Sequence, residues 1–252
     1  MIRAGALLLA ALTGAAPALA GQYHVPAQCK AHLTVQARGC LVSHYYRCEG
    51  EPAGNQWRVD IGAEGPFFVS QIDDEGQWLF SEDLIGGFSL RLKTENPDPA
   101  SLSQLFATGR DDYDFGRLLE DAVELQVRGH DELTGKRVTI DGVELEETTF
   151  AYRETSPAGL VISTAKGREY VHRDWRLFFS GVYEDPEGET NRSPARFDEP
   201  GDKGFLSDTP EYDCTGQMAA AKTESPPTVG LIAPVRLSLA SSRGPAAARP
   251  KE

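Results

Sequence analysis

The sequence predicts an all-β domain in which a mainly antiparallel sheet curls into a half-barrel or barrel and carries one or two short helices. Three runs alternate apolar and polar residues with a period of two, at residues 57–61, 88–92 and 123–127. This period is typical of strands with one face on a core and one in water. Glycine and proline separate such runs at intervals of about ten residues, a spacing typical of antiparallel sandwiches and barrels.

Residues 31–37 and 41–46 form the first predicted hairpin, with Arg38-Gly39 as a two-residue turn. Glycine suits this turn because it admits the positive φ angle that short hairpin loops require. A two-residue turn sets the register of the whole hairpin, and it places Leu33 opposite His44.

Four cysteines predict two disulfides, for which three pairings are possible. The hairpin register places Cys29 opposite Cys48, which leaves Cys40 to pair with Cys214. Zinc binding is the competing use of four cysteines, but the spacings contain no C-x-x-C pair.

One short helix is predicted after Asp98, which can cap it, with Pro99 in its first turn and Gly109 as its stop signal. We expect such a helix to plug an open side of a curled sheet. A second helical turn is predicted at residues 115–121. The apolar face of the first helix is formed by Leu102, Leu105 and Phe106.

Asp141-Gly142 is the strongest local hairpin signal, and it joins predicted strands at residues 137–140 and 143–152. The apolar positions of the second strand change from odd to even numbers along its length. A bulge or sharp bend near residues 146–149 would reconcile the two faces.

The stretch at residues 169–183 is the richest in large side chains, and Arg173 interrupts the apolar pattern of its odd positions. A charge that faces a core needs a partner or a ligand. One interpretation is a concave β face in which Arg173 anchors an anionic ligand beside Trp175 and Phe179. The alternative places Arg173 at the sheet rim, with its stem on Trp175 and its head in water.

The ends of the chain differ in character from the body. Residues 1–20 have the charged start, short apolar run and small-residue ending of a secretory signal peptide. We therefore expect one disulfide-bonded domain at residues 22–214, in the periplasm or secreted. Residues 215–252 are rich in proline and alanine and predict a disordered tail.

Charge limits the partners. The formal net charge is −13, and the acidic excess lies in the body of the chain. An acidic surface repels nucleic acid and anionic lipid. The sequence also contains no further stretch that predicts an integral membrane segment.

No motif for a cofactor, a metal site or a nucleophile is present, so the sequence favours a non-catalytic protein over an enzyme. The five histidines form neither H-E-x-x-H nor H-x-H. A β-scaffold hydrolase stays an alternative, and it would need titratable groups that converge, such as His44, His172 and Asp174.

The segments at residues 135–150 and 167–181 resemble the hairpin and long strand of uncharacterised secreted β-rich proteins of Gram-negative bacteria. In architecture they are also similar to the half-barrels of periplasmic lipoprotein carriers, whose curled sheet is covered by short helices. This resemblance implies a cavity lined by apolar side chains, although the carriers lack this cysteine pattern.

The favoured function is an exported binding or carrier module that holds an apolar or anionic small ligand on a concave β face. A large, deep apolar pocket would support a carrier, and a filled interior would count against it. An envelope protein-interaction or inhibitor module is the main alternative, and an exposed apolar patch would favour it.

Overall fold

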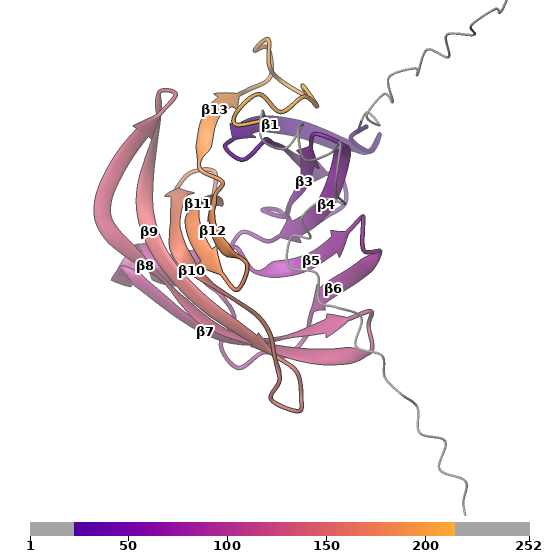
Figure 1. Cartoon of the computed structure of the whole chain (residues 1–252), viewed down its shortest axis with the longest axis vertical. Helices are drawn as coiled ribbons and strands as arrows, with labels where there is room; N and C mark the ends of the chain where they lie inside the picture. Colours follow the sequence, from indigo (N-terminus) through magenta and orange to yellow (C-terminus); the bar gives the residue numbers. More distant parts are fainter. Residues whose placement is uncertain (1–22, 215–252) are drawn as a thin grey trace, which may run out of the picture.

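The computed structural model describes residues 23–214, which form one antiparallel sheet of thirteen strands and one short helix. This architecture confirms the predicted all-β fold with a curled sheet (Figure 1). The elements are β1 (Cys29–Ala37), β2 (Leu41–Cys48), β3 (Gln56–Gly62), β4 (Gly65–Ile72), β5 (Trp78–Asp83), β6 (Phe88–Leu92), α1 (Leu102–Thr108), β7 (Arg110–Leu119), β8 (Val123–Ile140), β9 (Val143–Thr155), β10 (Val161–His172), β11 (Leu177–Asp185), β12 (Gly188–Asn191) and β13 (Pro194–Asp198).

The two edge strands of the sheet are consecutive in the chain. The strand order runs from β12 through β11 down to β1 and ends at β13. Only Arg192 and Ser193 join the two edges, and three peptide units span at most about 11 Å. The backbone N–H of Arg192 donates to Gly181 O in β11 (2.8 Å), and the N–H of Arg38, next to β1, donates to Ser193 O (2.9 Å). The sheet therefore curls into a ring, although β12 and β13 do not form a ladder with each other.

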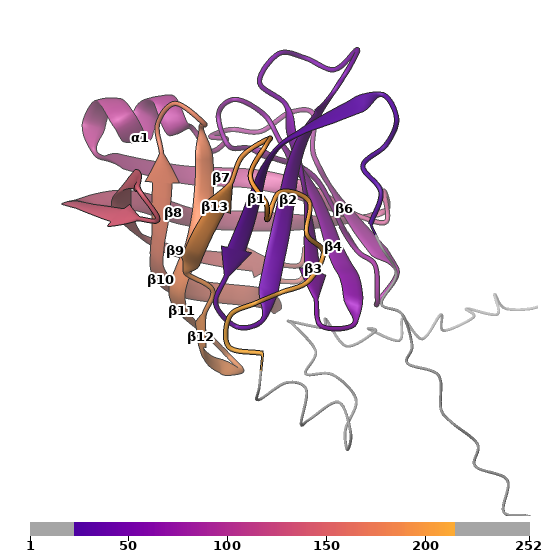
Figure 2. The same cartoon turned by 90° about the horizontal axis from the view of Figure 1, so that it is seen from above.

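Helix α1 lies at the end of the ring where β10 finishes, as Figure 2 shows. Its buried Leu102 and Leu105 pack against Val171 of β10. Ser101 is its N-cap and Gly109, at φ 86°, its C-cap. The helix thus packs against an open end of the curled sheet and ends at Gly109, as predicted. The predicted cap at Asp98 is wrong, because the backbone of that residue is engaged in an isolated bridge with Asp114.

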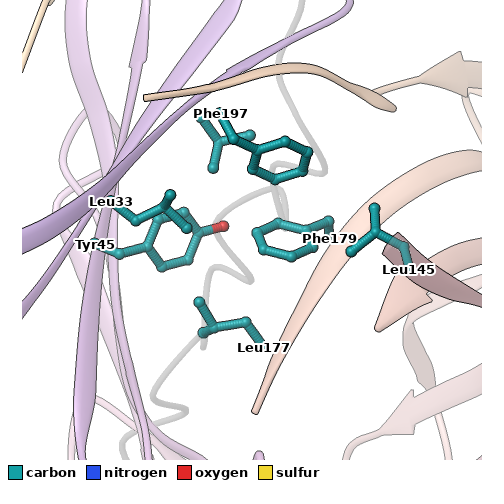
Figure 3. Packing of buried hydrophobic residues seen from close by; sticks show 7 residues of the cluster. Leu33, Tyr45, Leu145, Leu177, Phe179 and Phe197 are labelled. Carbon is teal, nitrogen blue, oxygen red and sulfur yellow. The ribbon is translucent and has the colours of Figure 1, made fainter. Parts of the chain in front are cut away.

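Aromatic and aliphatic side chains fill much of the ring. One cluster joins β1, β2, β9, β11 and β13, and its members are drawn in Figure 3. Within it the ring of Phe179 lies 5.9 Å from that of Tyr45 and 5.2 Å from that of Phe197. A second cluster, built on Phe115 and Val127, fills the side formed by β7 and β8.

The first hairpin differs from prediction in its turn and agrees in its disulfide. Its loop has three residues rather than two, with Gly39 at φ 71° and Cys40 at φ 57°. Leu33 therefore faces Tyr45 instead of His44. A register shift between Ala31 and Leu33 then restores the predicted alignment further along the hairpin.

Both disulfides form with the predicted pairing. Cys29 bonds Cys48 across the hairpin, and Cys40 bonds Cys214 over a separation of 174 residues. The second bond ties the start of the sheet to the segment that follows its last strand. The two bonds indicate a non-reducing environment.

The Asp141-Gly142 turn is confirmed, with φ angles of 48° and 82°. The predicted irregularity near residues 146–149 is present in the β8–β9 ladder, where the register shifts between Leu133 and Arg137, the partners of Thr148 and Glu146. The extra residues lie in β8 rather than in β9, whose ladder with β10 continues without a shift through this stretch.

The helical turn predicted at residues 115–121 is wrong. The first five of these residues belong to β7, which pairs with β8 along its full length. The predicted signal peptide (1–20) and tail (215–252) lie outside the described residues. Within residues 23–214, no helix is long and apolar enough to cross a membrane.

We expect loss of the Cys40–Cys214 bond to cost more stability than loss of the Cys29–Cys48 bond. The chain-entropy model gives about 5 kcal/mol for a loop of 174 residues and about 3 kcal/mol for one of 19. Denaturant unfolding of the two double-serine variants measures both values. A larger loss from the Cys29–Cys48 pair would contradict this account of the ring.

Candidate functional site

The structure places two of the three predicted ligand-binding residues together, Trp175 and Phe179, and directs Arg173 to other partners. The odd positions of residues 169–183 predict one continuous face, but the chain turns between β10 and β11, and Arg176 in this turn has φ 52°. Arg173 lies in the turn, with its guanidinium 4.4 Å from the Phe106 ring centroid and paired with Glu146. It is 43% exposed, so its head is in water.

Trp175 and Phe179 do lie together. Their rings are 6.2 Å apart, and Trp175 also stacks on His172 at 4.0 Å. Both aromatic rings contribute to the core cluster around Phe197. Both side chains therefore belong to the core that the curled sheet encloses. Of the three predicted residues, only Phe179 lines the cavity described below.

The residues suggested for a hydrolase do not converge either. His44 forms two hydrogen bonds through its ring. Its Nδ1 lies 3.0 Å from the Thr34 hydroxyl oxygen, and its Nε2 lies 2.9 Å from Asp208 Oδ1. This is the order of groups in a nucleophile–imidazole–carboxylate triad. However, Thr34 and His44 are both 0% exposed, and Leu206 N–H donates to the Thr34 hydroxyl. The three groups therefore clamp the C-terminal segment onto β1 and β2, while His172 and Asp174 lie in and beside the β10–β11 turn.

A cavity of about 200 Å³ opens at the end of the ring opposite α1. In an antiparallel meander alternate connections lie at the same end, and this end carries the β1–β2, β3–β4 and β5–β6 turns. We call it the mouth cavity. Its lining combines aromatic and polar side chains, chiefly Tyr45, Arg58, Asp60, Phe68, Phe179, Ser180, Tyr183 and Arg192.

Arg58 is the most unusual group in the mouth cavity. It projects from β3 beside Asp60, whose Oδ1 lies 3.1 Å from its Nε, and over the ring of Phe68 at 5.7 Å. The N–H at Nε is not directed at Asp60 and has no hydrogen-bond partner among the described residues. Asp60 also accepts a hydrogen bond from the Ser43 hydroxyl at 2.6 Å. The Arg58 side chain is 31% exposed and lines the cavity, so a guanidinium with incomplete hydrogen bonds borders this space.

Three carboxyl groups lie deeper on the same concave face. Asp111 of β7 is the direct cross-strand partner of Asp131 of β8. Glu169 of β10 is the partner of Thr148 on one side and of Ser180, a mouth-cavity residue, on the other. Because cross-strand partners project from the same face of a sheet, this register directs Glu169 and Ser180 toward one interior.

Burial raises the pKa of all three carboxyl groups. Desolvation raises the pKa of Glu169 to about 8, with a further rise from Asp131 and an opposing effect of Arg58. Desolvation raises the pKa of Asp131 to about 7, with a further rise from Asp111. The pKa of Asp111 rises to about 6, mainly by desolvation. Glu169 and Asp131 keep partial exposure, so they lie deep in the concavity without being sealed from water.

These groups are poorly satisfied by the protein. Asp111 accepts the Ser101 N–H at Oδ2 (2.8 Å), but its Oδ1 has no hydrogen-bond partner within residues 23–214. The Thr148 hydroxyl, 0% exposed, also lacks one there. Buried polar groups are normally paired, and an unpaired one is a candidate contact for water or a ligand.

A nearby buried ion pair shows the contrast. Arg117 lies 3.4 Å from Glu154, donates to the Ser81 hydroxyl at 2.7 Å and packs over the Trp78 ring at 5.2 Å. This pair neutralises its own charge and belongs to the packed part of the ring. Asp111, Asp131, Thr148 and Glu169 form a group that we call the carboxyl cluster, and within residues 23–214 none of its carboxyl groups forms an ion pair of this kind.

Sequence reasoning missed the carboxyl cluster, although one signal was present. Asp111 alternates along its strand with Tyr113 and Phe115, so it lies on the same apolar face as they do.

Comparison with protein families, with curated proteins and with solved structures finds no match. The resemblance to secreted β-rich proteins and lipoprotein carriers therefore stays a prediction.

We expect Thr148→Val to raise the free energy of unfolding by about 1 kcal/mol, because it removes a buried hydroxyl without a partner at nearly constant volume. Thr34→Val is the matched control. Its hydroxyl is also buried but is bonded to His44 and Leu206, so its loss should cost about 1–3 kcal/mol. Denaturant unfolding measures both, and equal losses in the two variants would show that Thr148 is satisfied.

Proposed function

We propose that the chain is an exported, non-catalytic binding module that holds a small polar molecule inside the ring, entered through the mouth cavity. The observation that carries this proposal is the incomplete hydrogen bonding of Arg58 where the cavity meets the carboxyl cluster. A few convergent polar groups in an otherwise aromatic pocket are typical of ligand sites, and mouths of β-barrels are a common place for them.

The size and lining of the cavity favour a small polar ligand over a lipid. A volume of about 200 Å³ is below the usual range for drug-sized ligands, and aromatic clusters occupy much of the remaining interior. The filled interior counts against a carrier of long acyl chains. An anionic ligand is also less favoured than the sequence suggested, because Asp60 already offsets the charge of Arg58.

Export to the periplasm or beyond is part of the same proposal. It is supported by the two disulfides and by the secretory pattern of residues 1–20.

A protein-interaction role is the second candidate, and exposed apolar residues at the turns favour it. Leu84 and Ile85 are 40% and 67% exposed in the β5–β6 turn, and Leu160 and Val161 are 60% and 43% exposed at the β9–β10 connection. Both connections lie at the mouth end of the meander. Exposed apolar residues of this kind are suited to contact with a partner protein.

Native mass spectrometry of the protein purified from its host compartment tests the binding function. We expect an added small mass that is lost on denaturation, with at least about ten-fold lower retention in Arg58→Gln because a hydrogen bond to a charged group is removed. Arg137→Gln, at a position 69% exposed on β8, is the control and should retain the mass.

A bound protein chain in place of a small mass would favour the interaction module. Protein with no added mass, or equal retention in both arginine variants, would contradict a ligand site at Arg58.

A further inference from the structure

We propose that the carboxyl cluster is the binding site for a primary ammonium group, so that the ligand of the ring is a small organic amine. This inference rests on the proposed binding function and gives its ligand a chemical class. The geometry that carries it is the convergence of Asp111, Asp131 and Glu169 from neighbouring strands onto one concave face.

The cluster offers acceptors that the protein does not use. Asp111 Oδ1 and the Thr148 hydroxyl oxygen are buried and without partners within the described part of the chain. The Thr148 side chain is directed to the cluster, since it lies directly across from Glu169 on the same face. An ammonium group brings three N–H donors and one positive charge to such a set of oxygens.

The surroundings supply no positive charge of their own that completes the site. Arg58 is the cation that lowers the pKa of Glu169, and it is already paired with Asp60. The other ionisable groups near the cluster are Tyr113, whose pKa the charges of Asp131 and Glu169 raise, and the acids beside Asp111. Those acids are Asp98, Asp112, which is paired with Arg110, and Glu75, which is paired with Arg176. Every uncompensated neighbour is therefore neutral or negative, which favours a cationic guest.

The arrangement of the carboxylate oxygens suits an extended amine better than a metal ion. No three acidic, histidine or cysteine side chains within residues 23–214 are close enough together to hold one metal ion. A flexible amine can instead bond one or two of the carboxylates at a time. Its other end would reach the mouth cavity by way of Ser180, the cross-strand partner of Glu169.

Binding should release protons, which distinguishes this site from simple surface attraction. The raised pKa values of Glu169 and Asp131 leave these groups partly protonated at neutral pH. An ammonium group stabilises the ionised carboxylates and so lowers their pKa values. Affinity should therefore increase as pH rises from 6 to 8, provided that the amine stays protonated.

Isothermal titration calorimetry with 1,4-diaminobutane and with glucosamine tests the proposal and separates a diamine source from an amino-sugar source. The matched neutral probes are 1,4-butanediol and glucose, which should not bind. Repeating the titration in two buffers with different ionisation enthalpies counts the protons released. We expect saturable binding of at least one amine, with net proton release at pH 7.

Glu169→Gln and Asp131→Asn should each weaken amine binding by at least ten-fold while the folded protein keeps or gains stability, since each removes a buried ionisable group. Glu144→Gln, on the exposed side of β9, is the control and should bind as the wild type does. Equal weakening in the control would mean non-specific charge attraction and would overturn the proposal.

The two levels of inference fail differently. If neither amine binds but native mass spectrometry shows a small mass that depends on Arg58, the ammonium site is wrong and the binding function stands. If neither amine binds and no such mass is present, both are wrong.

Discussion

The structure depends on the two-residue connection between its edge strands. Arg192 and Ser193 must join β12 to β13, which are the two ends of a thirteen-stranded sheet. This connection can be made only if the sheet curls through a full turn. The backbone hydrogen bonds from Arg192 to β11 and from Arg38 to Ser193 then hold the seam. The Cys40–Cys214 bond fixes the chain that follows β13 to the turn beside this seam.

Closure of the ring creates an interior with two kinds of content. Apolar clusters around Phe179 and Phe115 stabilise it, and the Arg117–Glu154 pair within it is compensated. The carboxyl cluster is different, because desolvation of carboxyl groups that repel each other costs free energy, and Arg58, itself paired with Asp60, offsets only part of this cost. Such groups are typical of binding sites, where groups that bind a ligand lower the stability of the fold.

Local patterns predicted the local structure well, and the interior could not be predicted from them. The Asp141-Gly142 turn, the Gly109 stop and the cysteine pairing follow from neighbouring residues. The pairing was obtained despite an incorrect turn length, because a register shift near Ala31 compensates for the third loop residue. The approach of Arg58 to Glu169 follows from closure of the whole ring, which no local period records.

The central claim is that closure brings Arg58 of β3 and Glu169 of β10 together across one interior. Carbon-13 NMR titration of the carboxyl groups tests it most directly, in the wild type and in Arg58→Gln. The account predicts a pKa near 8 for Glu169 and near 7 for Asp131, with a further rise at Glu169 when the Arg58 charge is removed. A Glu169 pKa near its ordinary value of 4.5, unchanged by the substitution, would contradict it.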